Sequence, residues 1–232
     1  MSAKEQPRRR PGRRKTADGA GAEPDILDIL RDRIATHVIP PGAKLLEQDL
    51  AEEFGVSRAR VREVLGALEL RGLIKREMNR GAIVAKLELT QVFEIYDVRE
   101  ALEGLCVRLA TQNVPPESWD DLIELFGEPM EALVEAGDID AYEKGYSEMR
   151  RRVIEAARNP VLVGMLDSIY EKTRTIMRRV LILPGRAAKG LKEHRAVLAA
   201  MRRGDADEAE RLKRANIRSA IEDLKRYQHY VL

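Results

Sequence analysis

The fold is decided by residues 50–65, which read Leu50-Ala51-Glu52-Glu53-Phe54-Gly55-Val56-Ser57-Arg58-Ala59-Arg60-Val61-Arg62-Glu63-Val64-Leu65. The apolar residues at the start of this stretch recur at the spacing of one face of a short helix. Gly55 supplies the left-handed conformation that ends such a helix, and Ser57 is placed to cap the next one. That second helix carries its apolar face on Val61, Val64, Leu65 and Leu68. The stretch therefore predicts a helix-turn-helix.

The flanking sequence extends this unit on both sides. Upstream, Pro24 fits the first turn of a helix that runs to about His37 and is stopped by Ile39-Pro40-Pro41-Gly42. Its expected inner face is Leu27, Leu30, Ile34 and Val38. Downstream of Gly72, two β-prone stretches, 73–76 and 82–87, flank the turn Met78-Asn79-Arg80-Gly81. Three helices followed by a hairpin describe a winged helix-turn-helix spanning residues 23–87.

Polar and basic side chains gather at the start of the second helix of the motif. Ser57, Arg58, Arg60 and Arg62 lie there, at the end of a recognition helix that enters the major groove of DNA. Arginine can bind guanine edges or phosphates, and the helix N-terminus adds a favourable partial charge toward phosphate. The alternative is a helical hairpin with a solvated charged face. For Arg80, beside Gly81 at the hairpin tip, minor-groove insertion and a solvated turn both stay open.

Composition restricts the remaining classes of protein. The 232 residues are 44% hydrophobic and 34% charged, which is typical of a globular chain with a core. No apolar run approaches the roughly 18 residues that span a bilayer, and the basic N-terminus lacks the apolar stretch of a secretory signal. The single cysteine, Cys106, lies among apolar neighbours and is expected to be buried. These features favour the cytoplasm.

The first 22 residues differ from the rest of the chain. They carry seven basic and two acidic side chains and have no apolar period, so we expect a disordered tail. Its basic residues either add non-specific phosphate contacts or are only solvated.

From Thr90 onward the pattern is helical almost throughout. Breaks at Pro115-Pro116, Gly137-Asp138, Asn159-Pro160, Leu183-Pro184-Gly185 and Gly204-Asp205 divide this segment into about six amphipathic helices. Asp138 and Asp205 are expected N-caps. The fold class is therefore mainly α, with an all-α bundle over residues 88–232. Nothing in the sequence assembles a nucleophile, an oriented base and an oxyanion donor, so we do not expect an enzyme.

The N-terminal unit resembles the winged helix of GntR-family regulators. The matching runs are Pro41-Gly42-Ala43-Lys44-Leu45-Leu46-Glu47, Leu50-Ala51, Gly55-Val56-Ser57-Arg58, Val61-Arg62-Glu63 and Leu68-Glu69-x-x-Gly72-Leu73-Ile74. By this resemblance Arg58 and Arg62 are the principal DNA-contacting arginines, with Ala59 and Arg60 between them. Members often have proline where this chain has Arg60, and some have a DNA-reading arginine where it has Gln48. Both departures bear on operator preference.

The C-terminal helices resemble the FadR-like subgroup, whose all-helical domain is known as FCD. The matching runs are Tyr96-Asp97-Val98-Arg99-Glu100-Ala101-Leu102-Glu103, Ala156-Ala157-Arg158-Asn159-Pro160, Glu193-His194-Arg195-Ala196-Val197-Leu198-Ala199-Ala200 and Gly204-Asp205-x-x-x-Ala209. The resemblance implies a six- or seven-helix bundle that encloses a small-molecule pocket and dimerises. It also implies that two recognition helices of a homodimer bind a pseudo-palindromic operator, usually as a repressor that a ligand releases.

Many FCD domains hold a divalent metal with one Asp and three His. The corresponding positions in this chain are Tyr146, Arg150, His194 and Asn216, of which only His194 is a metal ligand of that set. An arginine repels a cation and cannot ligate it, so we expect no cofactor and no metal. Our hypothesis is a pocket for a small organic acid anchored by a bidentate pair with Arg150, with hydrogen bonds from the other three residues.

Several alternatives stay open at this stage. Arg150 can instead pair with an internal carboxylate. Arg99, on the first bundle helix, is a second candidate for the pocket, although a salt bridge along or between helices also explains it. The whole chain can be a metal-dependent regulator or a constitutive DNA-binding protein without an effector.

Overall fold

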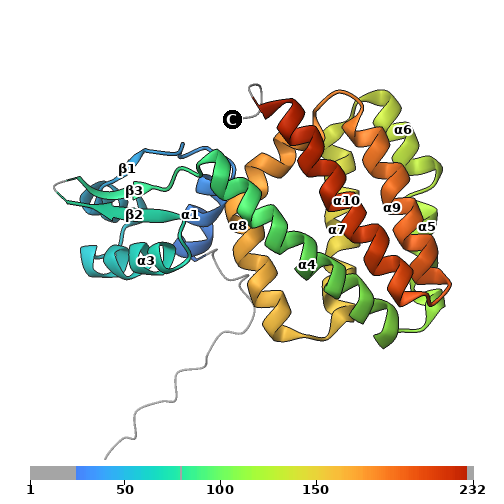
Figure 1. The fold of residues 1–232 in the computed structure, drawn as a ribbon. Helices are drawn as coiled ribbons and strands as arrows, with labels where there is room; N and C mark the ends of the chain where they lie inside the picture. The colour runs from blue at the N-terminus through green and yellow to red at the C-terminus, as the bar shows by residue number, and fades with distance from the viewer. Residues whose placement is uncertain (1–24, 79, 229–232) are drawn as a thin grey trace, which may run out of the picture.

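The computed structural model describes residues 25–78 and 80–228. The predicted basic tail of residues 1–22 lies outside this range. Figure 1 shows a small unit of helices and strands beside a larger, wholly helical unit. The predicted mainly α fold class, a winged helix followed by an all-helical domain, is confirmed.

The smaller unit contains α1 (Ile26–Ala35), β1 (Lys44–Leu45), α2 (Glu47–Phe54), α3 (Arg58–Leu70), β2 (Ile74–Glu77) and β3 (Gly81–Val84). The three strands form one antiparallel sheet in the order β1-β3-β2, in which Lys75 is the partner of Ile83 and Glu77 the partner of Gly81. The buried residues of α1, α3 and the sheet form one apolar core, centred on Leu30, Val61, Leu65, Leu68 and Ile74.

Two details of this unit correct the sequence prediction. The chain leaves α1 at Thr36, and His37 takes a positive φ of 60°, so Val38 points outward and is 71% exposed rather than part of the inner face. The wing is not a simple hairpin, because Lys44–Leu45 adds a third strand to it. A two-residue strand pairs through its backbone and leaves no side-chain period in the sequence.

The larger unit consists of α4 (Leu89–Asn113), the 3-10 turn Pro116–Trp119, α5 (Asp120–Leu125), α6 (Glu128–Ala136), α7 (Ile139–Ala157), α8 (Pro160–Leu181), α9 (Arg186–Arg202) and α10 (Ala206–Arg226). In Figure 1, α4 and α10 lie side by side across the face of this unit. One core cluster joins α4 to α7, α9 and the short helices, and a second lies among α4, α8 and α10.

In the larger unit, the predicted caps and the predicted burial of Cys106 agree with the structure, but one helix boundary was missed. The side chains of Asp138, Asn159 and Asp205 each accept a hydrogen bond from the backbone of the following turn, so both predicted aspartate caps are confirmed. Cys106 is buried as predicted. The break at Gly127 between α5 and α6 was not foreseen, because the apolar period continues across it.

The two units pack against each other through α1 and α8. Thr175 on α8 donates a hydrogen bond to the carbonyl of Ala35 at the end of α1. None of the described helices is long and apolar enough to cross a membrane.

Candidate DNA-binding surface and effector cavity

The N-terminus of α3 is built by a cap and a tight turn. Gly55 ends α2 in the left-handed conformation with φ of 63°. Two residues later the Ser57 side chain accepts a hydrogen bond from the backbone N–H of Arg60 at 3.2 Å. Ser57 and Ala59 are exposed beside this end. The cap fixes the direction in which the first turn of α3 faces solvent.

Arg58 lies on this exposed turn and Arg62 lies one turn further along α3, and the two share one carboxylate. Their side chains are 63% and 54% exposed, and both approach Glu47 on α2. The Arg62 Nε donates to Glu47 at 3.0 Å, whereas Arg58 lies 3.7 Å away. The hydrogen bond from Arg62, followed by the charges of both arginines, lowers the pKa of Glu47. Exposed pairs of this kind are weak, so a DNA phosphate can replace Glu47.

The side chains of Arg60, Arg80 and Gln48, which are also predicted to contact DNA, each have a partner of their own. Arg60 pairs with Glu63 at 2.8 Å and with Asp25 at 3.2 Å. Arg80, at the wing turn before Gly81, pairs with Glu77 at 2.7 Å. Gln48 donates to Glu52 on the same helix at 3.1 Å. The structure gathers Gln48 and the α3 residues on neighbouring helices, while Arg80 and Gly81 lie on the wing.

A cavity of about 730 Å³ lies where α8 faces the rest of the larger unit. Its walls come from both units of the chain, since α1 contributes as well as α4, α7, α8, α9 and α10. The lining residues include Asp28, Arg31, Asp32, Tyr96, Arg99, Tyr142, Tyr146, Arg150, Tyr170, Glu171, Arg174, Arg178, Arg186, His194 and Asn216. All five residues predicted from the sequence for an effector site are therefore brought together.

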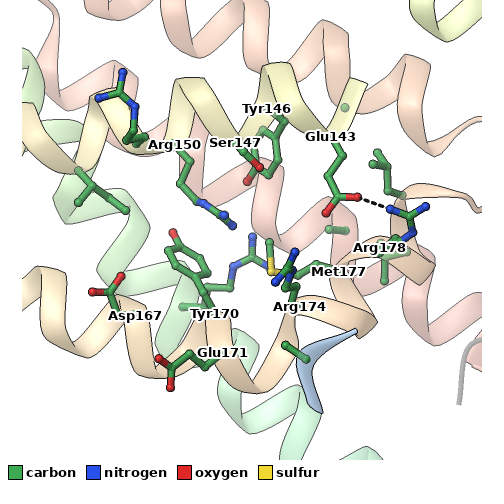
Figure 2. A pocket seen from close by; sticks show the side chains of 18 of the residues that line it. Glu143, Tyr146, Ser147, Arg150, Asp167, Tyr170, Glu171, Arg174, Met177 and Arg178 are labelled. Carbon is green, nitrogen blue, oxygen red and sulfur yellow. Dashed lines mark hydrogen bonds and ion pairs between the residues drawn. The ribbon is translucent and has the colours of Figure 1, made fainter. Parts of the chain in front are cut away.

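Arg150 stands out among the cavity arginines. It extends from α7 into the space above α8, where its guanidinium lies 4.4 Å from the centre of the Tyr170 ring and 6.0 Å from that of Tyr146 (Figure 2). Within the described part of the chain its guanidinium contacts these two rings and has no hydrogen bond or ion pair. The π faces of the two rings attract a cation but do not neutralise it. The alternative that Arg150 pairs with an internal carboxylate is thus not what this structure shows.

A second wall of the cavity is formed by Tyr146, His194 and Asn216. The Tyr146 and His194 rings are stacked with centroids 4.7 Å apart. Burial, and then the charges of Lys213 and Arg186, lower the pKa of His194, so its imidazole is neutral. Its buried Nδ1 has no hydrogen-bond partner in the described structure. Asn216 donates to Glu193 at 2.7 Å and accepts from Lys213 at 3.3 Å, so its amide is already engaged.

Behind this wall lies a buried ion cluster formed by Arg99, Glu103 and Lys213. Arg99 pairs with Glu103 one helical turn away, and Lys213 approaches the other carboxylate oxygen at 2.8 Å. The three side chains are only 4–6% exposed. Burial opposes ionisation of Glu103, but its two cations outweigh this and lower its pKa to about 2. Arg99 therefore has both roles considered for it, a salt bridge and a place in the cavity wall.

The residues at the family's metal position do not suit a divalent cation. The oxygen of Asn216 accepts from the Lys213 ammonium, which also lies 5.6 Å from the Tyr146 ring. A tethered ammonium and the Arg150 guanidinium both repel a metal ion, and His194 is the one imidazole of the set. No group of three or more His, Cys, Asp or Glu side chains suited to a metal occurs in the part of the chain that was placed.

Sequence reasoning missed several residues of this region. Glu103 follows Arg99 at the i,i+4 spacing of a helical ion pair, and that signal was available. Lys213 precedes Asn216 by one turn, but nothing in the sequence shows that it faces α4. Tyr170 and Arg186 carry no local signal. Arg186 is buried and held by Glu193 at 2.8 Å and Asp223 at 3.3 Å.

Ion pairs join the cavity wall to the winged helix. Glu171 on α8 is 15% exposed and accepts from Arg31 on α1 and from Arg71, which follows α3, at 3.3 Å. One turn further along α8, Arg174 pairs with Asp32 on α1 at 2.7 Å. Four of these residues, Arg31, Asp32, Glu171 and Arg174, also line the cavity.

Comparison with known proteins agrees with this arrangement. The chain is similar to the probable D-xylose utilization operon transcriptional repressor of Paenarthrobacter nicotinovorans, with 28% identity over 186 residues and 80% of each chain covered. It is 27% identical to the galactonate operon transcriptional repressor of Escherichia coli over 221 residues, which covers 86% of this chain and 95% of that one. Among solved structures, Escherichia coli McbR/YncC matches with a TM-score of 0.70 and 24% identity over 88% of this chain and 96% of that chain, which shows the fold.

Two family models match the two units of the structure. The bacterial regulatory proteins of the gntR family match residues 24–84, and the FCD domain matches residues 94–219. The named relatives are transcriptional regulators and not enzymes. The chain therefore belongs to the GntR family of DNA-binding transcriptional regulators, in the group that carries an effector-binding FCD domain.

Proposed function

We propose that this protein is a homodimeric repressor in the bacterial cytoplasm whose binding to a pseudo-palindromic operator is modulated by a small organic acid. The acid is held by Arg150 in the cavity, without a bound metal. The observation that carries this proposal is the Arg150 guanidinium, which lines the cavity and lacks a carboxylate among the described residues. A planar guanidinium binds a carboxylate through two parallel, charge-assisted hydrogen bonds.

DNA recognition in this proposal uses α3, with Arg58 and Arg62 exchanging Glu47 for base edges or phosphates. A single winged helix reads one half-site, and a two-fold dimer reads two. Sedimentation of the full chain tests this assembly. A species of twice the 26.2 kDa of the chain is expected, both free and on one operator duplex. A monomer on a single half-site contradicts it.

The coupling between cavity and operator goes through α1 and α8. Because Asp32 and Arg174 pair across the two units and both line the cavity, a ligand there can favour one arrangement of the winged helix over another. An effector acts only through such a difference in affinity for the two arrangements.

The test begins with a thermal-shift screen of the full chain against organic acids, sugar acids and aromatic acids, with and without chelator. A ligand at 100 times its Kd adds about 2.7 kcal/mol, which raises the Tm by a few degrees. A shift that survives the chelator is expected. A shift lost in chelator contradicts the metal-free site, and operator binding that no acid changes supports a constitutive DNA-binding protein.

The Arg150→Leu variant then tests the anchor, using a duplex that the protein selects from a random pool. Fluorescence anisotropy should show nearly unchanged operator affinity and a lost response to the acid. Arg218→Leu is the matched control, since Arg218 is an exposed arginine of α10 that pairs with Glu100 away from the cavity. An unchanged acid response in Arg150→Leu removes Arg150 from the site.

A further inference from the structure

The buried ion cluster beside the cavity has more cations than carboxylates. Arg99 and Lys213 share the single carboxylate of Glu103. The pKa of Glu103 is lowered and that of Lys213 is raised by their attraction, although burial opposes both, so the cluster stays ionised. One positive charge in it is therefore not balanced by a neighbouring carboxylate.

The Arg99 guanidinium of this cluster and the Arg150 guanidinium share one aromatic neighbour, Tyr170. The Arg99 guanidinium lies 5.0 Å from the Tyr96 ring centre and 5.8 Å from that of Tyr170, whose ring also contacts Arg150. Lys213 stays behind Tyr146 and does not line the cavity. By sharing Glu103 with Arg99, Lys213 leaves the charge of Arg99 available to the cavity.

Among the described residues, none of the carboxylates that line the cavity pairs directly with Arg99 or Arg150. Its remaining arginines, Arg31, Arg151, Arg174, Arg178 and Arg186, each have a carboxylate partner. Asp167 is exposed at the rim and, in Figure 2, its carboxylate points away from the Arg150 guanidinium. In the described structure Arg150 therefore has no carboxylate partner, and Arg99 has only a share of Glu103. A buried charge is costly unless it is paired.

We propose that the cavity selects a small organic dianion. One acidic group of this ligand binds Arg150, and its second negative charge faces Arg99. Lys213 is the residue that sets this preference for two charges. This inference rests on the proposed function, because it specifies the acid that Arg150 holds. A dicarboxylate and a phosphate monoester share the required chemistry. Lys213 acts through Glu103 and Arg99 and is a positioning residue.

The experiment compares acids that differ by one charge, using the full chain at pH 7.5 and constant ionic strength. Succinate is paired with monomethyl succinate, glucarate with gluconate, and glycerol phosphate with its methyl diester. Thermal shift and calorimetry should show at least one dianion binding about tenfold or more tightly than its monoanionic partner. The first two pairs report a dicarboxylate and the third a phosphate.

Three variants separate the effect of charge from that of structure. Lys213→Met removes one cation, so the dianion should lose its advantage while the monoanion still binds. The double variant Glu103→Gln/Lys213→Met removes a cation and a carboxylate together, which restores the net charge and should restore the dianion preference. Lys213→Arg keeps the positive charge and should retain the dianion preference. The melting temperature of each ligand-free variant shows whether it is folded.

The outcomes distinguish this inference from the proposed function. If monoanions bind as tightly as dianions and Arg150→Leu abolishes both, the organic-acid function stands and the charge preference is wrong. If Glu103→Gln/Lys213→Met lacks the dianion preference just as Lys213→Met does, the role of Lys213 is overturned. If no acid of either charge binds, or if Arg150→Leu leaves binding unchanged, the proposed function fails and this inference fails with it.

Discussion

The two arginine-rich regions of this protein use the same side chain in opposite ways. On α3, Arg58 and Arg62 are more than half exposed and share the partly exposed Glu47. Beside the cavity, Arg99 and Glu103 are about 95% buried. A pair in water contributes little and exchanges readily, whereas breaking a buried pair leaves an uncompensated charge. The exposed pair therefore suits a surface that exchanges partners, and the buried pair suits a fixed wall.

The largest expected effect comes from breaking the buried pair. Glu103→Gln leaves Arg99 and Lys213 without their carboxylate and should lower the free energy of unfolding by about 3–5 kcal/mol. Urea denaturation of the full chain measures this. Glu103→Gln/Lys213→Met also removes the charge of Lys213 but leaves Arg99 without a carboxylate, so it should recover only part of the loss. Equal stability of Glu103→Gln and wild type contradicts the cluster.

Acid should weaken the buried pair in a defined window. The pKa of Glu103 is lowered to about 2 in the folded chain, so its stabilisation is complete above its ordinary pKa and is lost as the pH falls toward 2. The free energy of unfolding of the wild type should therefore fall more steeply below pH 4.5 than that of Glu103→Gln/Lys213→Met. Parallel curves for the two proteins show that Glu103 has an ordinary pKa.

A smaller effect is expected on the exposed side of the comparison. Arg58→Ala or Arg62→Ala should weaken operator binding by about 1–3 kcal/mol and leave the Tm nearly unchanged. Anisotropy on the selected duplex measures the affinity. Arg211→Ala is the control, because Arg211 is also 63% exposed and pairs with Glu208 on α10, away from the winged helix. If Arg211→Ala weakens operator binding and Arg58→Ala does not, the DNA-binding surface lies elsewhere on the protein.

The smallest effect should come from Glu47, which occupies the two arginines in the free protein. Glu47→Gln removes a negative charge beside the predicted phosphate contacts and a weak exposed pair. Operator binding should tighten by about 0.2–1 kcal/mol, with little change in stability. The same anisotropy assay at low and high salt measures it. Weaker binding in this variant indicates that Glu47 orients the arginines for DNA.

The winged helix was largely predictable because its signals are local. Gly55 and Ser57 mark a turn and a cap within a few residues, and the apolar period of α3 is regular, so the helix-turn-helix follows from them. The third strand of the wing and the outward turn at His37 were not predictable, since backbone pairing and a positive φ leave little pattern in side chains.

The sequence by itself determined most of the helices of the larger unit, the caps at Asp138 and Asp205, and the presence of Arg150 where a metal ligand is usual in the family. Only the tertiary structure decided that Arg150 has no carboxylate in the described chain, that Lys213 on α10 reaches Glu103 on α4, and that α1 closes the cavity. The physical reason is distance along the chain. A helical period shows which face of a helix is buried, but not which residues of another helix meet it there.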